Sequence, residues 1–227
     1  RLSYYLGIGK KEEYVNLVNR GSRIFNFFII PLSFGLMILG PQAILLYGSE
    51  KYIGGANLTS LFAVRTIILA LDTILGSQIL FTNGFEKRIT VYTVFAGVLN
   101  LILDSLLYFN NIITPEYYLI TTMLSESFLL ILYAIFIHKK KLISLRHIFK
   151  YTVRYSLFAL TFVPIYFLVN AIYPVKMVIN LPFLINMLII MALSALSYIG
   201  LLIWTKDSIF YEFLGHFVSL KRRIKKS

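Results

Sequence analysis

Five ionisable residues lie inside long apolar segments of this chain, and they are the side chains best placed to do chemistry. They are Arg65, Asp72, Asp104, Glu126 and Arg154. A charged group at the centre of a bilayer costs about 2.5–3.5 kcal/mol on insertion scales, so such groups usually face a protein interior or an aqueous cavity. There they either contact a substrate or a coupling ion, or they pair with one another as part of the structure.

Four of these residues belong to polar stripes at helical spacing, because residues three or four positions apart share one face of a helix. Three successive apolar segments carry one stripe each: Arg65, Leu69, Asp72 and Gly76; Thr93, Gly97, Asn100 and Asp104; and Tyr118, Thr122 and Glu126, with Ser125 adjoining. This pattern predicts one shared hydrophilic surface. On the structural alternative, Arg65 pairs with Asp104 or Asp72, and Glu126 bonds a neighbouring Ser or Thr. Arg154 lies about one turn from a segment end, and we interpret it as an interfacial anchor.

The elements that must position these residues are membrane helices. Hydrophobic residues make up 58% of the 227 positions and charged residues only 14%, and the mean hydropathy is +0.78. A transmembrane helix needs about 20 apolar residues, and six stretches are long enough: Ile24–Leu46, Leu58–Phe81, Ile89–Tyr108, Tyr118–Ile137, Tyr151–Tyr173 and Ile179–Trp204. The sequence therefore predicts an all-α, polytopic membrane bundle of six transmembrane helices.

The basic residues are divided unequally between the two sides of this predicted bundle. Of the 22 Lys and Arg residues, 18 flank the spans on one side and only Lys51 and Lys176 lie on the other. The positive-inside rule places the basic side in the cytoplasm, together with both ends of the chain. The net charge of +12 is then a topology signal and a contact for anionic lipids, densest at Lys221–Lys226, and not a nucleic-acid site.

The sequence divides into three parts. Residues 1–23 include Glu12–Arg23, whose spacing predicts an interfacial helix at the cytoplasmic surface. Residues 24–204 form the predicted bundle, in which Pro31 with Gly35, and Pro164, are candidate hinges or static kinks. Residues 205–227 form a basic cytoplasmic tail. The chain starts at Arg1 without a signal-peptide pattern, and we expect it to be a piece of a longer protein.

Signatures of soluble enzymes are absent from the sequence. There is no cysteine, and the three histidines, His138, His147 and His216, lack metal-site spacing. We therefore expect no metal, no cofactor and no enzymatic activity.

The order of several short motifs resembles a family of bacterial membrane transporters. These motifs are Arg1-Leu2-Ser3, Glu13-Tyr14, Asn19-Arg20, Ile30-Pro31 with Gly35, Leu46-Tyr47-Gly48 with Tyr52, Gln78-Ile79-Leu80 with Gly84 and Lys87, Asn100, and Thr121-Thr122 with Ser125-Glu126. Over residues 1–140 they resemble the polysaccharide-biosynthesis C-terminal domain of the oligosaccharide flippases, in the multidrug, oligosaccharidyl-lipid and polysaccharide exporter superfamily. The resemblance implies one bundle of a two-bundle transporter in the bacterial inner membrane, whose partner bundle is the N-terminal half of the same protein.

The resemblance also implies an activity. Such proteins move an undecaprenyl-diphosphate-linked oligosaccharide between leaflets by alternating access, and polysaccharide-assembly proteins are possible partners. A diphosphate headgroup needs a fixed cation, so Arg65 is the expected contact, with Asn100 and Asp104 beside it. Asp72 and Glu126 are the expected coupling-ion or cavity residues. Two alternatives stay open: a cation-coupled exporter of drug-like molecules, and a membrane glycosyltransferase or polymerase, although the short outward loops disfavour the latter.

Overall fold

The protein is built from helices. The computed structural model describes residues 1–48 and 50–215, and this part of the chain contains no strand. In chain order the elements are α1 (Leu2–Gly7), α2 (Lys11–Ile38), α3 (Gly40–Gly48), the 3₁₀ helix η1 (Glu50–Gly55), α4 (Ala56–Asp72), the π-helix η2 (Thr73–Phe81), α5 (Glu86–Phe109), α6 (Pro115–Lys139), α7 (Arg146–Ala159), α8 (Phe162–Ile172) and α9 (Leu181–Trp204). Residues 208–215 are also helical. The basic patch predicted at Lys221–Lys226 lies outside the described residues.

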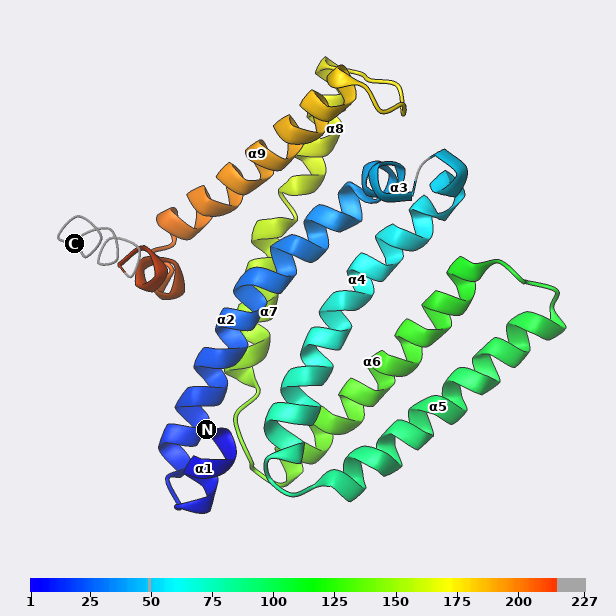
Figure 1. Ribbon diagram of the computed structural model, residues 1–227. Coiled ribbons are helices and arrows are strands. Elements are labelled where there is room, and N and C mark those ends of the chain that lie inside the picture. Colours follow the sequence, from blue (N-terminus) through cyan, green and yellow to red (C-terminus); the bar gives the residue numbers. More distant parts are fainter. Residues whose placement is uncertain (49, 216–227) are drawn as a thin grey trace.

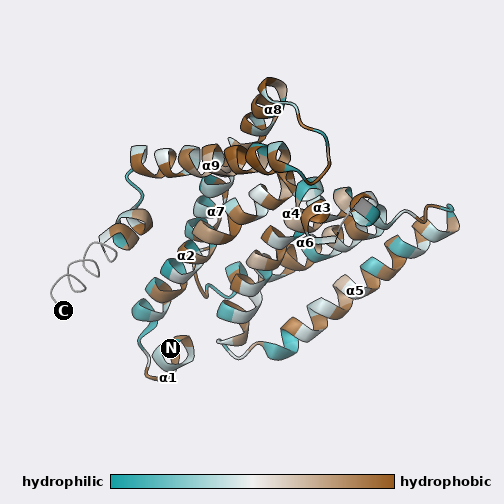
Figure 2. Ribbon diagram, turned by 45° about the horizontal axis from the view of Figure 1, so that its top comes forward, coloured by the Kyte–Doolittle hydropathy of each residue, from teal (hydrophilic) through white to brown (hydrophobic). Residues whose placement is uncertain are grey.

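Six helical stretches are long and apolar enough to cross a membrane. They are Lys11–Ile38, Lys51–Phe81, Glu86–Phe109, Pro115–Lys139, Arg146–Ile172 and Leu181–Trp204. Large apolar side chains such as Phe95, Leu101 and Trp204 lie exposed on them, and hydrophobic residues run along much of α8 and α9 (Figure 2). Because lipid solvates such a surface, the structure is that of a multi-pass membrane protein. The predicted all-α polytopic bundle is confirmed.

Helix α2 is the central element. It packs against α4 and against α7, while α6 packs against both α4 and α5, and α8 packs against α9. Figure 1 shows α5 and α9 at opposite edges of the resulting layer. One apolar core surrounds Tyr14, Ile79 and Tyr133, and a second surrounds Ile30 and Tyr155. The α4–α5–α6 group and the α7–α9 group are thus joined through α2.

Loops alternate between the two ends of the bundle. The loops at 82–85 and 140–145 lie at the same end as α1, whereas those at 110–114 and 173–180 lie at the other end (Figure 1). We call the first the basic end, because the loop residues Lys140 and Lys141 and the adjoining helix starts with Lys87 and Arg146 lie there. The alternation agrees with the predicted order of the spans.

Residues 12–23 are not a separate helix. They form the first half of α2, which runs without a break from Lys11 to Ile38. Tyr14, Val18 and Ser22 are buried at four-residue intervals, so the inward-facing stripe of the first span starts before the predicted boundary at residue 23. No helix breaker separates the two predicted segments, and the helix continues through Gly21.

The first span breaks at Leu39, between α2 and α3, and not at Pro31. A proline leaves the carbonyl four residues earlier without its helical donor. Here the Phe27 carbonyl accepts from the hydroxyl of Tyr198 at 3.1 Å, so Pro31 stays within a continuous helix. At the break, a Cβ on Gly40 would lie 3.2 Å from the backbone nitrogen of Ser60. Glycine therefore permits the close approach of α3 to α4.

The fifth span breaks where Pro164 was expected to bend it. Helix α7 ends at Ala159 and α8 starts at Phe162. Pro164 cannot donate to the Leu160 carbonyl, which instead accepts from the Val163 nitrogen at 3.1 Å. This tighter turn separates the two helices. A hinge function for Pro31, Gly35 or Pro164 remains a prediction.

Candidate polar groove

The three predicted polar stripes meet in one groove between α4, α5 and α6. The cavity has a volume of about 230 Å³ and is lined by Leu69, Asp72, Thr93, Ala96, Gly97, Asn100, Thr122, Ser125, Glu126 and Leu129. Each of the three helices contributes at least one polar side chain, and all of these lie well inside the apolar segments. The predicted shared surface is therefore present, with an apolar floor around Leu69, Ala96 and Leu129.

Glu126, which lines the groove, forms an ion pair with Arg65, which is not among the lining residues. The Nε atom of Arg65 donates to Glu126 Oε2 at 2.9 Å and to Oε1 at 3.1 Å, and Nη2 donates to Oε1 at 2.5 Å. Two donors of one guanidinium thus hold both oxygens of one carboxylate. The side chains remain 23% and 22% exposed. The structural alternative expected an aspartate as the partner of Arg65, and this pairing is wrong.

Asp104 is held by two neutral donors. Asn100 Nδ2 donates to its Oδ2 at 2.7 Å, and Thr121 Oγ1 donates to its Oδ1 at 2.5 Å. Because Thr121 is on α6, this carboxylate joins α5 to α6 near the end opposite the basic end. Asn100 lines the groove, but Asp104 does not. Of these two predicted substrate contacts, the groove therefore includes Asn100 and not Asp104.

Asp72 is the third carboxylate, and it lies at the junction of α4 and η2. It lines the groove, and within the described chain no hydrogen bond or ion pair holds it. A Cβ on Gly76 would lie 3.6 Å from Asp72 Oδ1 and 3.2 Å from the ring of Tyr133. The Tyr133 hydroxyl in turn lies 3.5 Å from Thr93 Oγ1. Gly76 therefore lets Tyr133 pack beside Asp72.

The π-helix η2 was not predicted from the sequence. Its wider turn shifts the residues after Asp72 relative to an α-helix, and π-turns often occur at functional sites. Tyr14 donates to the Gln78 carbonyl at 3.2 Å, while Asn83 donates to Tyr14 at 2.8 Å and to the Ile79 carbonyl at 2.7 Å. These contacts satisfy backbone groups near the end of η2. Gly76, a poor helix former, is the one local signal in this segment.

A second charged cluster at the basic end was also missed. We call it the basic-end cluster; its members are Arg23, Arg154, Tyr155, Asp207 and Ser208. Asp207 is fully buried; its Oδ2 accepts from Arg23 at 2.7 Å and from Tyr155 at 3.2 Å. Its Oδ1 accepts from the backbone nitrogens of residues 209 and 210, at 3.0 and 3.3 Å. Asp207 thus caps the helical segment 208–215, and a carboxylate before an apolar helix was the available signal.

Arg154 reaches this cluster as an end-of-helix anchor would. Its Nη2 donates to the Thr205 carbonyl at 3.2 Å, and its Nη1 lies 3.9 Å from Asp207 Oδ2. The predicted anchoring role agrees with this geometry, because the side chain extends toward the end of α9 and away from the groove.

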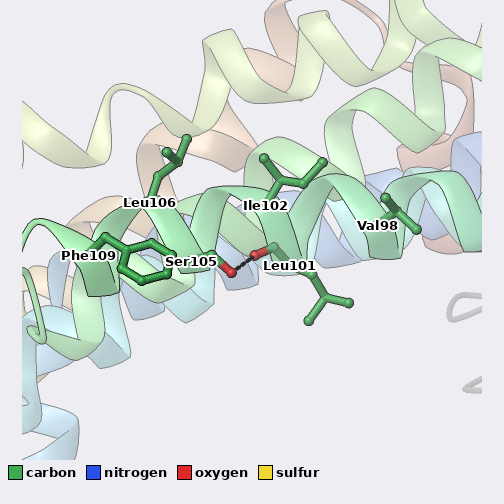
Figure 3. A pocket seen from close by; sticks show the side chains of 6 residues that line it. All are labelled: Val98, Leu101, Ile102, Ser105, Leu106 and Phe109. Atoms are coloured by element: carbon green, nitrogen blue, oxygen red, sulfur yellow. Dashed lines mark hydrogen bonds between the residues drawn. The ribbon is translucent and has the colours of Figure 1, made fainter.

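The groove gathers polar side chains from several helices, and a second hollow in the described part of the chain does not. The other, of about 300 Å³, is lined by Val98, Leu101, Ile102, Ser105, Leu106 and Phe109, all from α5. Figure 3 shows these side chains, with Ser105 bonded to the carbonyl of Leu101 on its own helix at 2.7 Å. This second hollow is a shallow depression on the lipid-facing side of α5. In the described residues, no three His, Cys, Asp or Glu side chains are grouped as a metal site requires.

Comparison with known proteins adds no assignment: no protein-family model matches this chain, and no curated protein matches it significantly.

Proposed function

We propose that this chain is one bundle of a flippase that moves an undecaprenyl-diphosphate-linked oligosaccharide across the bacterial inner membrane by alternating access. The observation that carries the proposal is Arg65, an arginine inside a membrane segment whose ion-pair partner, Glu126, lines the groove. A guanidinium offers a diphosphate paired donors in a fixed geometry. Asn100, Thr122 and Ser125 line the same groove and supply neutral hydrogen-bonding groups for sugar or phosphate oxygens.

We also propose a partner bundle, an orientation in the membrane and the groups that couple transport to an ion. The walls of the groove come from α4, α5 and α6, and a second bundle, the N-terminal half of the same protein, would supply the opposite wall. The distribution of Lys and Arg supports an orientation with the basic end in the cytoplasm, where anionic lipids would meet it. Asp72 and Glu126 are the groups that would couple transport to an ion. Polysaccharide-assembly proteins remain proposed partners.

The test is the substitution Arg65→Gln in the organism that makes the protein. We expect lipid-linked oligosaccharide to accumulate and surface polysaccharide to fall, because the diphosphate loses its cation. Arg88→Gln is the matched control, since it makes the same change at an exposed position near the start of α5. Normal surface polysaccharide from a well-expressed Arg65→Gln protein would reject the assignment of Arg65.

One observation favours a second candidate, an exporter of cationic small molecules. Asp72 lines the groove and has no bonded partner in the described chain, so a carboxylate is free to meet a cation. Thermal stabilisation of the purified protein separates the two functions. Lipid diphosphates should raise the melting temperature of a flippase, whereas cationic dyes should raise that of a drug exporter.

A further inference from the structure

We infer that a diphosphate and Glu126 compete for the guanidinium of Arg65, so that the groove takes up a proton when the anion binds. This inference rests on the proposed function, because it names how the same site would bind its anion. It comes from the pairing of Arg65 and from the charge of the groove.

The guanidinium edge formed by Nε and Nη2, which offers an anion paired donors, is already in use. Both Nε and Nη2 of Arg65 point at Glu126, with contacts of 2.5 to 3.1 Å. Phosphate oxygens bind an arginine through the same kind of paired donors. An anion therefore gains this edge of the guanidinium only when the Glu126 carboxylate leaves it.

The charge of the groove opposes an anion as long as every carboxylate is ionised. Besides Glu126 itself, the charged and titratable groups around it are Arg65 and Asp72 from α4, Asp104 from α5 and Tyr133 from α6. Among the described residues, two carboxylates, Asp72 and Glu126, thus line the groove beside one cation, while Asp104 is bonded outside it. A diphosphate diester brings two further negative charges into a poorly screened site, where like charges repel strongly. Neutralising a carboxylate removes this repulsion.

Glu126 is the carboxylate whose state changes on binding. Asp104 keeps both of its neutral donors, at 2.7 and 2.5 Å, and Asp72 has no bond to lose in the part of the chain that the structure describes. Glu126 loses Arg65, its one cationic partner among the described residues, and remains near Asp72, inside a membrane segment. Loss of a counter-ion and proximity to a like charge both favour the protonated form of a carboxyl group. The proton comes from water and resides on a Glu126 oxygen.

The consequence is a linkage between pH and affinity. The complex holds one proton more than the free protein, so raising the pH favours the free protein. We expect the affinity for the anion to fall about tenfold per pH unit over the range in which one proton is taken up. A dialkyl diphosphate is the suitable probe, because its two charges do not titrate in this range.

The experiment is calorimetry of the full-length protein in nanodiscs with a dialkyl diphosphate, in buffers of different ionisation enthalpy. The dependence of the heat on the buffer gives the number of protons taken up. The wild type should take up about one proton. Glu126→Gln, which keeps the volume but not the charge, should take up none and should bind more tightly at high pH. Glu116→Gln is the matched control, because it changes a glutamate in the first turn of the same helix.

Each outcome separates the inference from the proposed function. If the wild type binds without proton uptake, or if Glu126→Gln still takes up a proton, the exchange at Arg65 is wrong and the flippase proposal stands. Affinity that depends on sodium at fixed pH, with no proton uptake, also overturns the exchange. If the wild type does not bind the diphosphate, or if Arg65→Gln binds it equally well, the proposed function itself fails. Because the wild-type proton count needs no variant, a misfolded Glu126→Gln protein leaves the test intact.

Discussion

Two arginine–carboxylate pairs in this protein differ in how completely they are enclosed. Asp207 in the basic-end cluster is fully buried, and its partner Arg23 is 12% exposed. Glu126 and Arg65 at the groove are 22% and 23% exposed. Asp207 also accepts from Tyr155 and from two backbone nitrogens, whereas Glu126 has Arg65 as its only bonded partner within the described chain. One carboxylate is bonded by donors from several residues, and the other by a single residue.

This difference separates a structural pair from an exchangeable one. A buried carboxylate with several donors is costly to disturb, because each donor is left unsatisfied when it is removed. A carboxylate with one partner beside a cavity can release that partner to a competing anion at lower cost. The comparison therefore assigns fastening of the C-terminal segment to the basic-end cluster, and it makes the groove pair the one that a competing anion would displace more easily.

The largest effect should come from Asp207→Ala. Removing this carboxylate leaves Arg23 as a buried unpaired cation and uncaps residues 208–215, so we expect a loss of about 3–5 kcal/mol of stability. Unfolding in mixed micelles, followed by circular dichroism, measures the loss. Ser208→Ala is the milder control, because it removes only the 2.7 Å contact with Arg23 Nη1. A loss no larger than that of the control would mean that the cluster is not a fastening point.

A smaller effect is expected for Glu126→Ala at the groove. Arg65 is then unpaired, but its side chain is 23% exposed and not buried, so the loss should be about 1 kcal/mol. The same unfolding assay applies. Equal losses for Glu126→Ala and Asp207→Ala would break the comparison, since the groove pair would then be as structural as the buried one.

The two regions also differ in how far the sequence predicted them. The groove was predicted because helical periodicity is local: polar residues at three- and four-residue steps fix the face of each helix. The partner of Arg65 was not predicted, because pairing depends on the rotation and depth of α4 relative to α6. The π-turn after Asp72 changes that rotation, and only Gly76 hints at it.

The basic-end cluster could not be predicted from local patterns. Arg23 and Asp207 are 184 positions apart, and their meeting depends on how α9 returns to the start of α2. The breaks in the spans show the same limit. Pro164 ends a helix as expected, whereas Pro31 does not, because Tyr198 on α9 supplies the donor that the Phe27 carbonyl lacks.

A third effect on stability is expected from the hydrogen bond between the Tyr198 hydroxyl and the Phe27 carbonyl. Tyr198→Phe removes the donor to the Phe27 carbonyl, and we expect a loss of about 1 kcal/mol, as for other hydrogen bonds within membrane helices. Tyr166→Phe is the matched control, because the Tyr166 hydroxyl has only a 3.5 Å contact with Gln42. Combining Tyr198→Phe with Pro31→Ala should recover the loss, since residue 31 then donates its own N–H. A purely additive double variant would show that the carbonyl finds another donor.

The smallest effect should come from Arg20→Ala, also on α2 at the basic end. Arg20 pairs with Glu212, but its side chain is 60% exposed and that of Glu212 is 34% exposed. An exposed pair contributes about 0.2–1 kcal/mol and is screened by salt. We therefore expect a small loss in the unfolding assay at low ionic strength and none at high ionic strength, whereas the loss from Asp207→Ala should persist in salt. If both losses vanish in salt, the strength of the basic-end cluster comes from charge alone and not from its burial.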